Sequence, residues 1–120
     1  MLSRWANEQY AYLTTTGRRT GKPHRIEIWF AAADGRLFFL SGGRDRSDWV
    51  RNLLANPQVT VELGDETYRG LARVVDEGSA EDPRARELLV AKYREGDSLE
   101  SWGRTALPIV VELVAETGRE

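Results

Sequence analysis

The chain has 120 residues, of which 41% are hydrophobic and 30% charged, a composition typical of a single folded domain spanning residues 1–120. It contains no cysteine and a single histidine, which excludes disulfides, thiolate catalysis and cysteine-based metal sites and gives no reason to predict a metal centre. The formal net charge is -2 and no apolar run is long enough to span a bilayer. We therefore expect a cytoplasmic protein with no integral membrane segment and no nucleic-acid partner.

The first part of the chain is predicted to form three antiparallel strands in a meander. Alternating apolar and polar residues indicate the strands, and the even-numbered residues of the second strand share one face. Asp34-Gly35 is a strong hairpin signal between the second and third strands. The three strands are expected at residues 10–16, 24–32 and 36–41.

The rest of the chain alternates between helices and strands. A helix beginning at Asp45 or Ser47 is expected to end near Asn56, because Pro57 follows. The other expected elements are strands at 58–63, 66–75 and 109–114, a helix at 80–94 and a short helical turn at 99–102. Short strands with helices between them predict a mainly β domain, a closed or nearly closed barrel with helices packed outside.

The loop between the first two strands carries three cations, Arg18, Arg19 and Lys22, together with Gly17 and Gly21. Glycine lets the backbone approach another molecule closely, and N–H donors combined with cations can surround a phosphate or carboxylate. The glycine spacing is not that of a Walker loop, and a strand rather than a helix follows. The loop is predicted to hold a small anionic ligand; the alternative is a solvated basic hairpin tip.

No nucleophile–base pair stands out in the sequence. His24 is the single imidazole, available as a proton donor or as a hydrogen-bonding residue of the hairpin. Tyr93 can donate a proton to a reduced substrate or pack with its hydroxyl in water. Ser41-Gly42-Gly43, just before a helix, is a second candidate anion cradle, and Trp49 is either a core residue or a cofactor contact.

Four segments together resemble the deazaflavin-dependent nitroreductase family. They are Thr14–Pro23, Ser41–Gly43, Asn52–Val61 and Trp102–Val111, and they occur in the family's order and spacing over nearly the whole chain. The resemblance implies a split β-barrel of about six antiparallel strands with two to three packed helices, like the FMN-binding pyridoxamine-phosphate oxidase fold. It also implies the cofactor F420, an 8-hydroxy-5-deazaflavin with a phosphate and a polyglutamate tail; FMN is less expected.

The resemblance assigns roles to residues of the loop, of the strand end at Ser41 and of the helix that follows. The predicted cofactor-binding residues are Thr16, Gly17, Arg18, Arg19, Thr20, Gly21, Lys22, Pro23, His24, Ser41, Gly42, Gly43, Trp49 and Asn52. Of these, the resemblance implies Arg18–Gly21, Ser41–Gly43, Trp49 and Asn52. The candidate catalytic residues are Tyr93 and His24 as proton donors, and Ser41, whose backbone would hold the ring.

The sequence departs from the family's pattern at two places. Ser41 is followed directly by Gly42, where many members have an intervening lysine. Tyr93 matches one tyrosine of the nitroreducing members, but the other matching positions are Gly96 and Leu99. Prodrug-type nitroreduction is therefore not assumed.

The predicted function is transfer of a hydride from reduced F420 to a small electrophilic acceptor: a quinone, a nitro compound or an enone. The alternative is a non-catalytic carrier of the same fold, binding a lipid, a tetrapyrrole or FMN. Split barrels commonly pair, so a homodimer is expected, although the family also has monomers.

Overall fold

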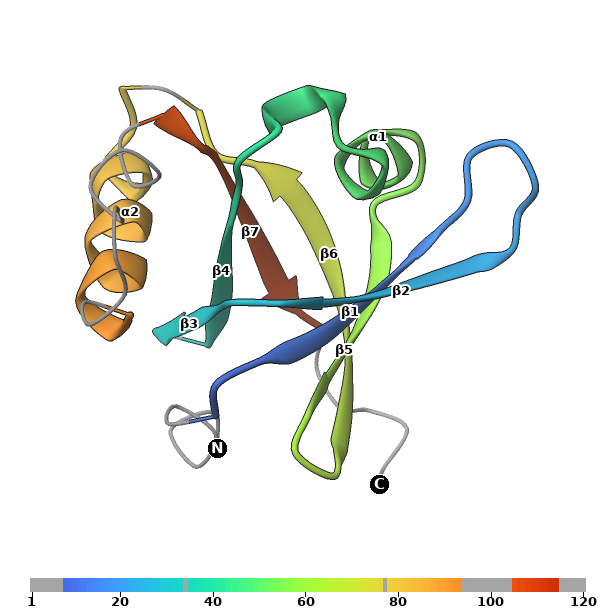
Figure 1. The fold of residues 1–120 in the computed structure, drawn as a ribbon, viewed down its shortest axis with the longest axis horizontal. Helices are drawn as coiled ribbons and strands as arrows, with labels where there is room; N and C mark the ends of the chain where they lie inside the picture. Colours follow the sequence, from blue (N-terminus) through green and yellow to red (C-terminus); the bar gives the residue numbers. More distant parts are fainter. Residues whose placement is uncertain (1–7, 34, 77, 94–104, 115–120) are drawn as a thin grey trace.

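A single antiparallel sheet, curled into a half-barrel, dominates the structure (Figure 1). The computed structural model describes residues 8–33, 35–76, 78–93 and 105–114. Its strands are β1 (Ala11–Thr16), β2 (Pro23–Ile28), β3 (Ala31–Ala33), β4 (Arg36–Ser41), β5 (Gln58–Leu63), β6 (Glu66–Val74) and β7 (Leu107–Leu113). The helices are the 3-10 turn η2 (Arg44–Arg46), α1 (Asp48–Ala55) and α2 (Glu81–Lys92). The predicted mainly β fold with packed helices is confirmed.

The strand expected at 24–32 is two strands, interrupted at Trp29 and Phe30. The sheet order is β2-β1-β5-β6-β7-β4-β3, so these two successive strands lie at opposite edges. The two expected hairpin pairings, β1 with β2 and β3 with β4, are confirmed, but β4 also pairs with β7 and not with β2, so the expected continuous meander is wrong. Because the chain passes directly from one edge to the other, the two edges are held together and the sheet curls.

The other expected elements lie close to their predicted places. α1 ends at Ala55, just before Asn56 and Pro57. The predicted helix at 80–94 is α2, whose described part ends at Lys92, and the turn expected at 99–102 lies outside the described residues. β6 ends at Val74, one residue earlier than expected.

Apolar residues gather on both faces of the sheet at β4 and β7. Inside the half-barrel the core is closed at one end by Val50 and Leu53 of α1, and a second cluster lies between the outer face of the sheet and α2. Ile109 and Val111 belong to the inner core and Val110 to the outer one, and all three are fully buried. The predicted burial of the last strand on both faces is thus confirmed.

Two side chains at the end of α2 satisfy the backbone at the interruption between β2 and β3. The Tyr93 hydroxyl accepts a hydrogen bond from Phe30 N at 3.0 Å and lies 3.0 Å from Phe30 O and 2.9 Å from Gln9 O, to which it can donate. Lys92 Nζ donates to Phe30 O at 3.0 Å and lies 3.5 Å from the centroid of the Phe30 ring. Without these partners the buried backbone polar groups of Phe30 would carry a desolvation cost.

Burial lowers the pKa of the Lys92 ammonium to about 8, although Glu8 acts in the opposite direction. The unfolded chain, with an ordinary lysine pKa, binds more protons than the folded chain between pH 8 and 10.5, so the free energy of unfolding should rise with pH in this window. After discounting for partial exposure, we expect the rise from this group to be about 1 kcal/mol. Urea unfolding of the wild type and of Lys92→Met from pH 7 to 9.5 isolates it. A stability difference between the two proteins that stays constant with pH would contradict the prediction.

Candidate functional site

The basic loop between β1 and β2 is closed by its own hydrogen bonds. Gly17 N donates to Lys22 O at 2.7 Å, Gly21 N donates to Gly17 O at 2.8 Å, and Lys22 N donates to Thr20 Oγ1 at 3.2 Å. Gly21 has a φ of +74°, which favours glycine. At Gly17 a Cβ would lie 2.9 Å from His24 Nε2, so the imidazole packs directly against the loop. The loop is thus a defined turn.

The loop is docked onto α1 through Asn52, which is 1% exposed. Asn52 Oδ1 accepts hydrogen bonds from Arg18 N at 3.2 Å and from Arg18 Nη1 at 2.8 Å, while its Nδ2 donates to Thr15 Oγ1 at 3.2 Å. Arg18 Nη2 also forms an ion pair with Asp48 Oδ1 at 3.3 Å. Arg18 and Asn52, both expected to touch the cofactor, are therefore the joint between loop and helix.

Arg18 is thereby engaged inside the protein, and the loop's exposed charge comes from its two other cations. Arg19 and Lys22 are exposed, and within the described ranges neither has an ion-pair partner. Thr20, Gly21 and Pro23 are exposed beside them, as is His24. The structure brings these predicted residues together at one end of the hairpin, away from the α2 side of the molecule (Figure 1).

The turn at the end of β4 is organised by Ser41, which is 2% exposed. Its hydroxyl donates to Arg44 O at 2.9 Å and lies 3.0 Å from Ser47 Oγ. Arg44 has a φ of 54°, a left-handed conformation that these contacts hold in place. Gly42 and Gly43 are exposed between them. The hydroxyl of Ser41 thus shapes the second candidate cradle.

The remaining predicted aromatic residues lie in two different places. Trp49 packs against the inner core, edge-on to Phe39 with ring centroids 6.4 Å apart. Tyr93 is stacked on Trp29 with centroids 4.2 Å apart and planes 6° apart, and burial raises the pKa of its phenol. Tyr93 is thus grouped with Trp29 and Phe30, not with the basic loop. Gly96, Leu99 and Trp102 lie outside the described residues.

Sequence reasoning missed two residues that hold the site together. Thr15 accepts a hydrogen bond from Asn52, and Asp48 pairs with Arg18. The sequence signals for Thr15 and Asp48 were weak. Thr15 occupies an inward-facing position of β1, where a buried hydroxyl requires a partner. Asp48 is the first residue of α1, where a carboxylate is favoured by the helix dipole.

The described part of the chain offers neither a set of metal ligands nor a helix that could cross a membrane. No group of three histidine, cysteine or carboxylate side chains there could hold a metal ion. No helix of those residues is long and apolar enough to cross a membrane.

Comparison with known proteins adds to this geometry. A sequence profile of the F420H2-dependent quinone reductase family matches residues 2–114. The chain belongs to that family. The match confirms the predicted resemblance, the reductase class and F420 as its cofactor.

Solved structures show the same fold at low sequence identity. The chain is similar to an F420-H2-dependent reductase, FDR-A, with 24% identity and a TM-score of 0.73, over 88% of this chain and 95% of that one. A domain-swapped dimer matches with 24% identity and a TM-score of 0.72, over 88% and 81% of the two chains. The heme storage protein HutZ from Vibrio cholerae matches with 18% identity and a TM-score of 0.76, over 95% and 88%.

The residues of the basic loop fit the anionic part of the family's cofactor. Arg19 and Lys22 offer two exposed cations, and at Gly21 a Cβ would meet nothing within 4 Å, so the backbone there is open to a ligand. Gly42 and Gly43 leave exposed backbone at the neighbouring turn. Cations combined with accessible N–H groups are the donor set that phosphate and glutamate carboxylates require.

Proposed function

We propose that the chain reduces a small electrophilic acceptor, with reduced F420 as the hydride donor. We expect the acceptor to be a quinone in preference to a nitro compound or an enone. The observation that carries this proposal is the family match over residues 2–114, in a chain whose docked basic loop presents Arg19 and Lys22 to solvent. When bound, reduced F420 supplies the hydride, and the protein supplies orientation.

In this proposal some of the predicted cofactor-binding residues contact the cofactor, and the others hold those residues in position. Arg19 and Lys22 bind the anionic tail, and the backbone of Thr20 and of the Gly42-Gly43 pair contributes N–H donors. Gly21, whose N–H donates to Gly17 O, leaves room for the tail. Residues that make contacts inside the protein position these groups; they are Thr16, Gly17, Arg18, Ser41, Trp49 and Asn52. Pro23, which is exposed, ends the loop at the start of β2. Loop and turn keep their shapes because Asn52 and Ser41 make buried hydrogen bonds.

A proton must also reach the reduced acceptor, and we assign its delivery to His24 in preference to Tyr93. His24 is exposed and its imidazole packs against Gly17 of the basic loop. The Tyr93 hydroxyl is buried and hydrogen-bonded to the backbone of Phe30, which leaves it poorly placed to release a proton. The Ser41 hydroxyl already donates to Arg44 O.

Steady-state oxidation of reduced F420 with menadione as acceptor tests the function and the proton donor together. We expect the wild type to turn over, and His24→Gln to lower kcat at least about tenfold, since a positioned acid contributes ~10²-fold or more. Tyr93→Phe should change kcat less than about threefold, because its hydroxyl serves the fold. Absence of wild-type turnover with menadione and with a nitro or enone acceptor would contradict the proposed function. If Tyr93→Phe loses at least about tenfold in kcat while His24→Gln does not, and both variants stay folded, the proton donor is Tyr93 and not His24.

Two further expectations belong to this proposal. A homodimer is supported by a structural neighbour described as a domain-swapped dimer. Residence in the cytoplasm is supported by the family's reductase class. The carrier alternative is distinguished from the reductase by its ligand, which would be FMN, a tetrapyrrole or a lipid in place of F420.

A further inference from the structure

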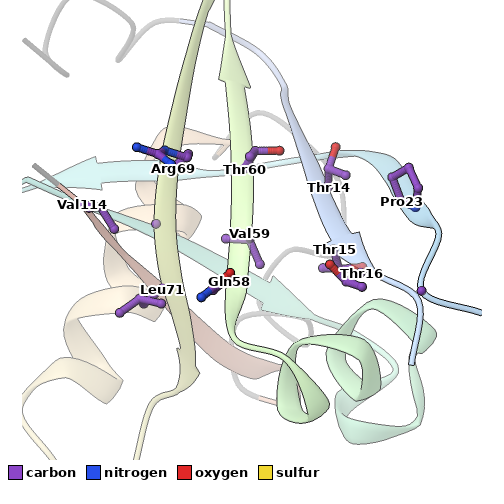
Figure 2. A pocket seen from close by; sticks show the side chains of 12 residues that line it. Thr14, Thr15, Thr16, Pro23, Gln58, Val59, Thr60, Arg69, Leu71 and Val114 are labelled. Atoms are coloured by element: carbon purple, nitrogen blue, oxygen red, sulfur yellow. The ribbon is translucent and has the colours of Figure 1, made fainter. Parts of the chain in front are cut away.

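A cavity of about 570 Å³ lies on the outer face of the sheet, over β1, β5 and β6. Figure 2 shows Thr14, Thr60 and Arg69 side by side on these three strands, with Gln58 and Leu71 further along. Successive residues of a strand point to opposite faces, and Leu13 and Val61 on these strands are fully buried in the inner core, so Thr14 and Thr60 face outward. The cavity is thus on the opposite side of the sheet from the inner core, outside the site described above except at its rim.

One row of residues across this face carries two arginines with different surroundings. The strand register places Arg25 opposite Thr14, Thr14 opposite Thr60, and Thr60 opposite Arg69. Arg25 is neutralised by Glu62, which accepts hydrogen bonds from its Nε at 3.0 Å and its Nη2 at 3.1 Å. Arg69 has no ion-pair partner anywhere in the described ranges. The cavity therefore presents one uncompensated positive charge beside two threonine hydroxyls.

Apolar surface adjoins this charge. Leu71 is 48% exposed and Val114 is 42% exposed, and both line the cavity. Val114 is held beside Arg69 by a hydrogen bond from its N–H to Arg69 O at 2.9 Å. A ligand that pairs with Arg69 would cover these two side chains with an apolar portion.

We propose that this cavity binds an organic carboxylate, with Arg69 paired to the carboxylate, Thr14 and Thr60 donating hydroxyl hydrogen bonds, and Leu71 and Val114 covering the adjacent carbon chain. A single guanidinium matches one negative charge, and its planar fork fits a carboxylate with two parallel hydrogen bonds. The ligand has two sources that share this chemistry. It is a separate small molecule, or a glutamate of the F420 tail, because Thr16, Gly21 and Pro23 at the basic loop also line the cavity.

The test is a titration of ¹⁵N-labelled protein with octanoate, and with octanol as the uncharged control, followed by amide chemical shifts. Octanoate should shift the amides of Thr14, Thr60 and Leu71 and bind at least tenfold more tightly than octanol. Arg69→Gln should remove that preference, whereas the charge-neutral control Arg25→Gln combined with Glu62→Gln should keep it, because that control removes the Arg25–Glu62 pair as a whole. Equal binding of octanoate and octanol, or equal effects of Arg69→Gln and the control, would overturn the proposal. This titration uses no F420, so its failure leaves the proposed function standing.

Competition then identifies the source of the carboxylate. Displacement of octanoate by F420 carrying several glutamates, but not by the form with none, assigns the cavity to the cofactor's tail. Displacement by neither form assigns it to a separate carboxylate ligand. Displacement by the form without glutamates as well would assign the cavity to a part of the cofactor other than its glutamates, and would overturn both a glutamate and a separate small molecule as its ligand.

Discussion

Replacing Asn52 with leucine is expected to lower the free energy of unfolding by about 2–4 kcal/mol and to weaken F420 binding more than about tenfold. Leucine is similar in size but cannot replace the three hydrogen bonds that Asn52 makes with Arg18 and Thr15. The Thr15 hydroxyl, which is 1% exposed, would be left buried without that partner. The basic loop would lose its attachment to α1, so Arg19 and Lys22 would no longer be held in place.

The matched control is Asp48→Asn, which removes the other link between the loop and α1. Its ion pair with Arg18 is largely exposed, because the Asp48 side chain is 78% exposed. Exposed ion pairs contribute little to the free energy of unfolding, so we expect Asp48→Asn to lower it by less than about 1 kcal/mol and to change F420 affinity only slightly. Urea unfolding and F420 titration check both variants. If Asn52→Leu were no worse than Asp48→Asn, Asn52 would not be the joint between loop and helix.

The double substitution Arg19→Ala with Lys22→Ala is expected to raise the Kd for F420 at least tenfold while leaving stability nearly unchanged. Charge-assisted contacts are worth about 1.5–3 kcal/mol each, and the lower end applies here because both side chains are exposed. Surface changes of this kind usually alter the free energy of unfolding by less than about 0.5 kcal/mol. The measurement is F420 titration at two salt concentrations.

Arg84→Ala on α2 serves as the control for that experiment. It also removes a positive charge, but from the opposite side of the molecule to the basic loop (Figure 1). Its F420 affinity should match that of the wild type. Unchanged affinity in the Arg19/Lys22 double variant would remove the loop from the cofactor site.

Much of the first hairpin could be predicted from the alternation of apolar and polar residues along its strands. Ile26 and Ile28 were expected on one face, and the register places them opposite Leu13 and Ala11 on the core side. The interruption after Ile28 could not be predicted in the same way. It depends on Lys92 and Tyr93, whose contacts with Phe30 join positions more than sixty residues apart in the chain.

The sequence placed the basic loop correctly between the first two strands, but the roles of its residues in binding the cofactor stay predictions. Composition and glycine spacing were enough to indicate the loop itself. They could not show that Arg18 is engaged by Asn52 and Asp48, because those partners lie on a helix 30 or more residues later. Likewise, nothing local to Ser41 showed that its hydroxyl would be buried against Arg44 O and Ser47 Oγ.

Whether this chain binds F420 is measured by titrating the purified protein with F420, and separately with FMN, and following tryptophan fluorescence. Trp49 lies on α1 beside the loop-docking residues, so binding of the ring should quench its emission. We expect micromolar or tighter binding of F420 and much weaker binding of FMN. No response to F420, together with uptake of FMN, a tetrapyrrole or a lipid, would contradict this expectation and establish the carrier alternative.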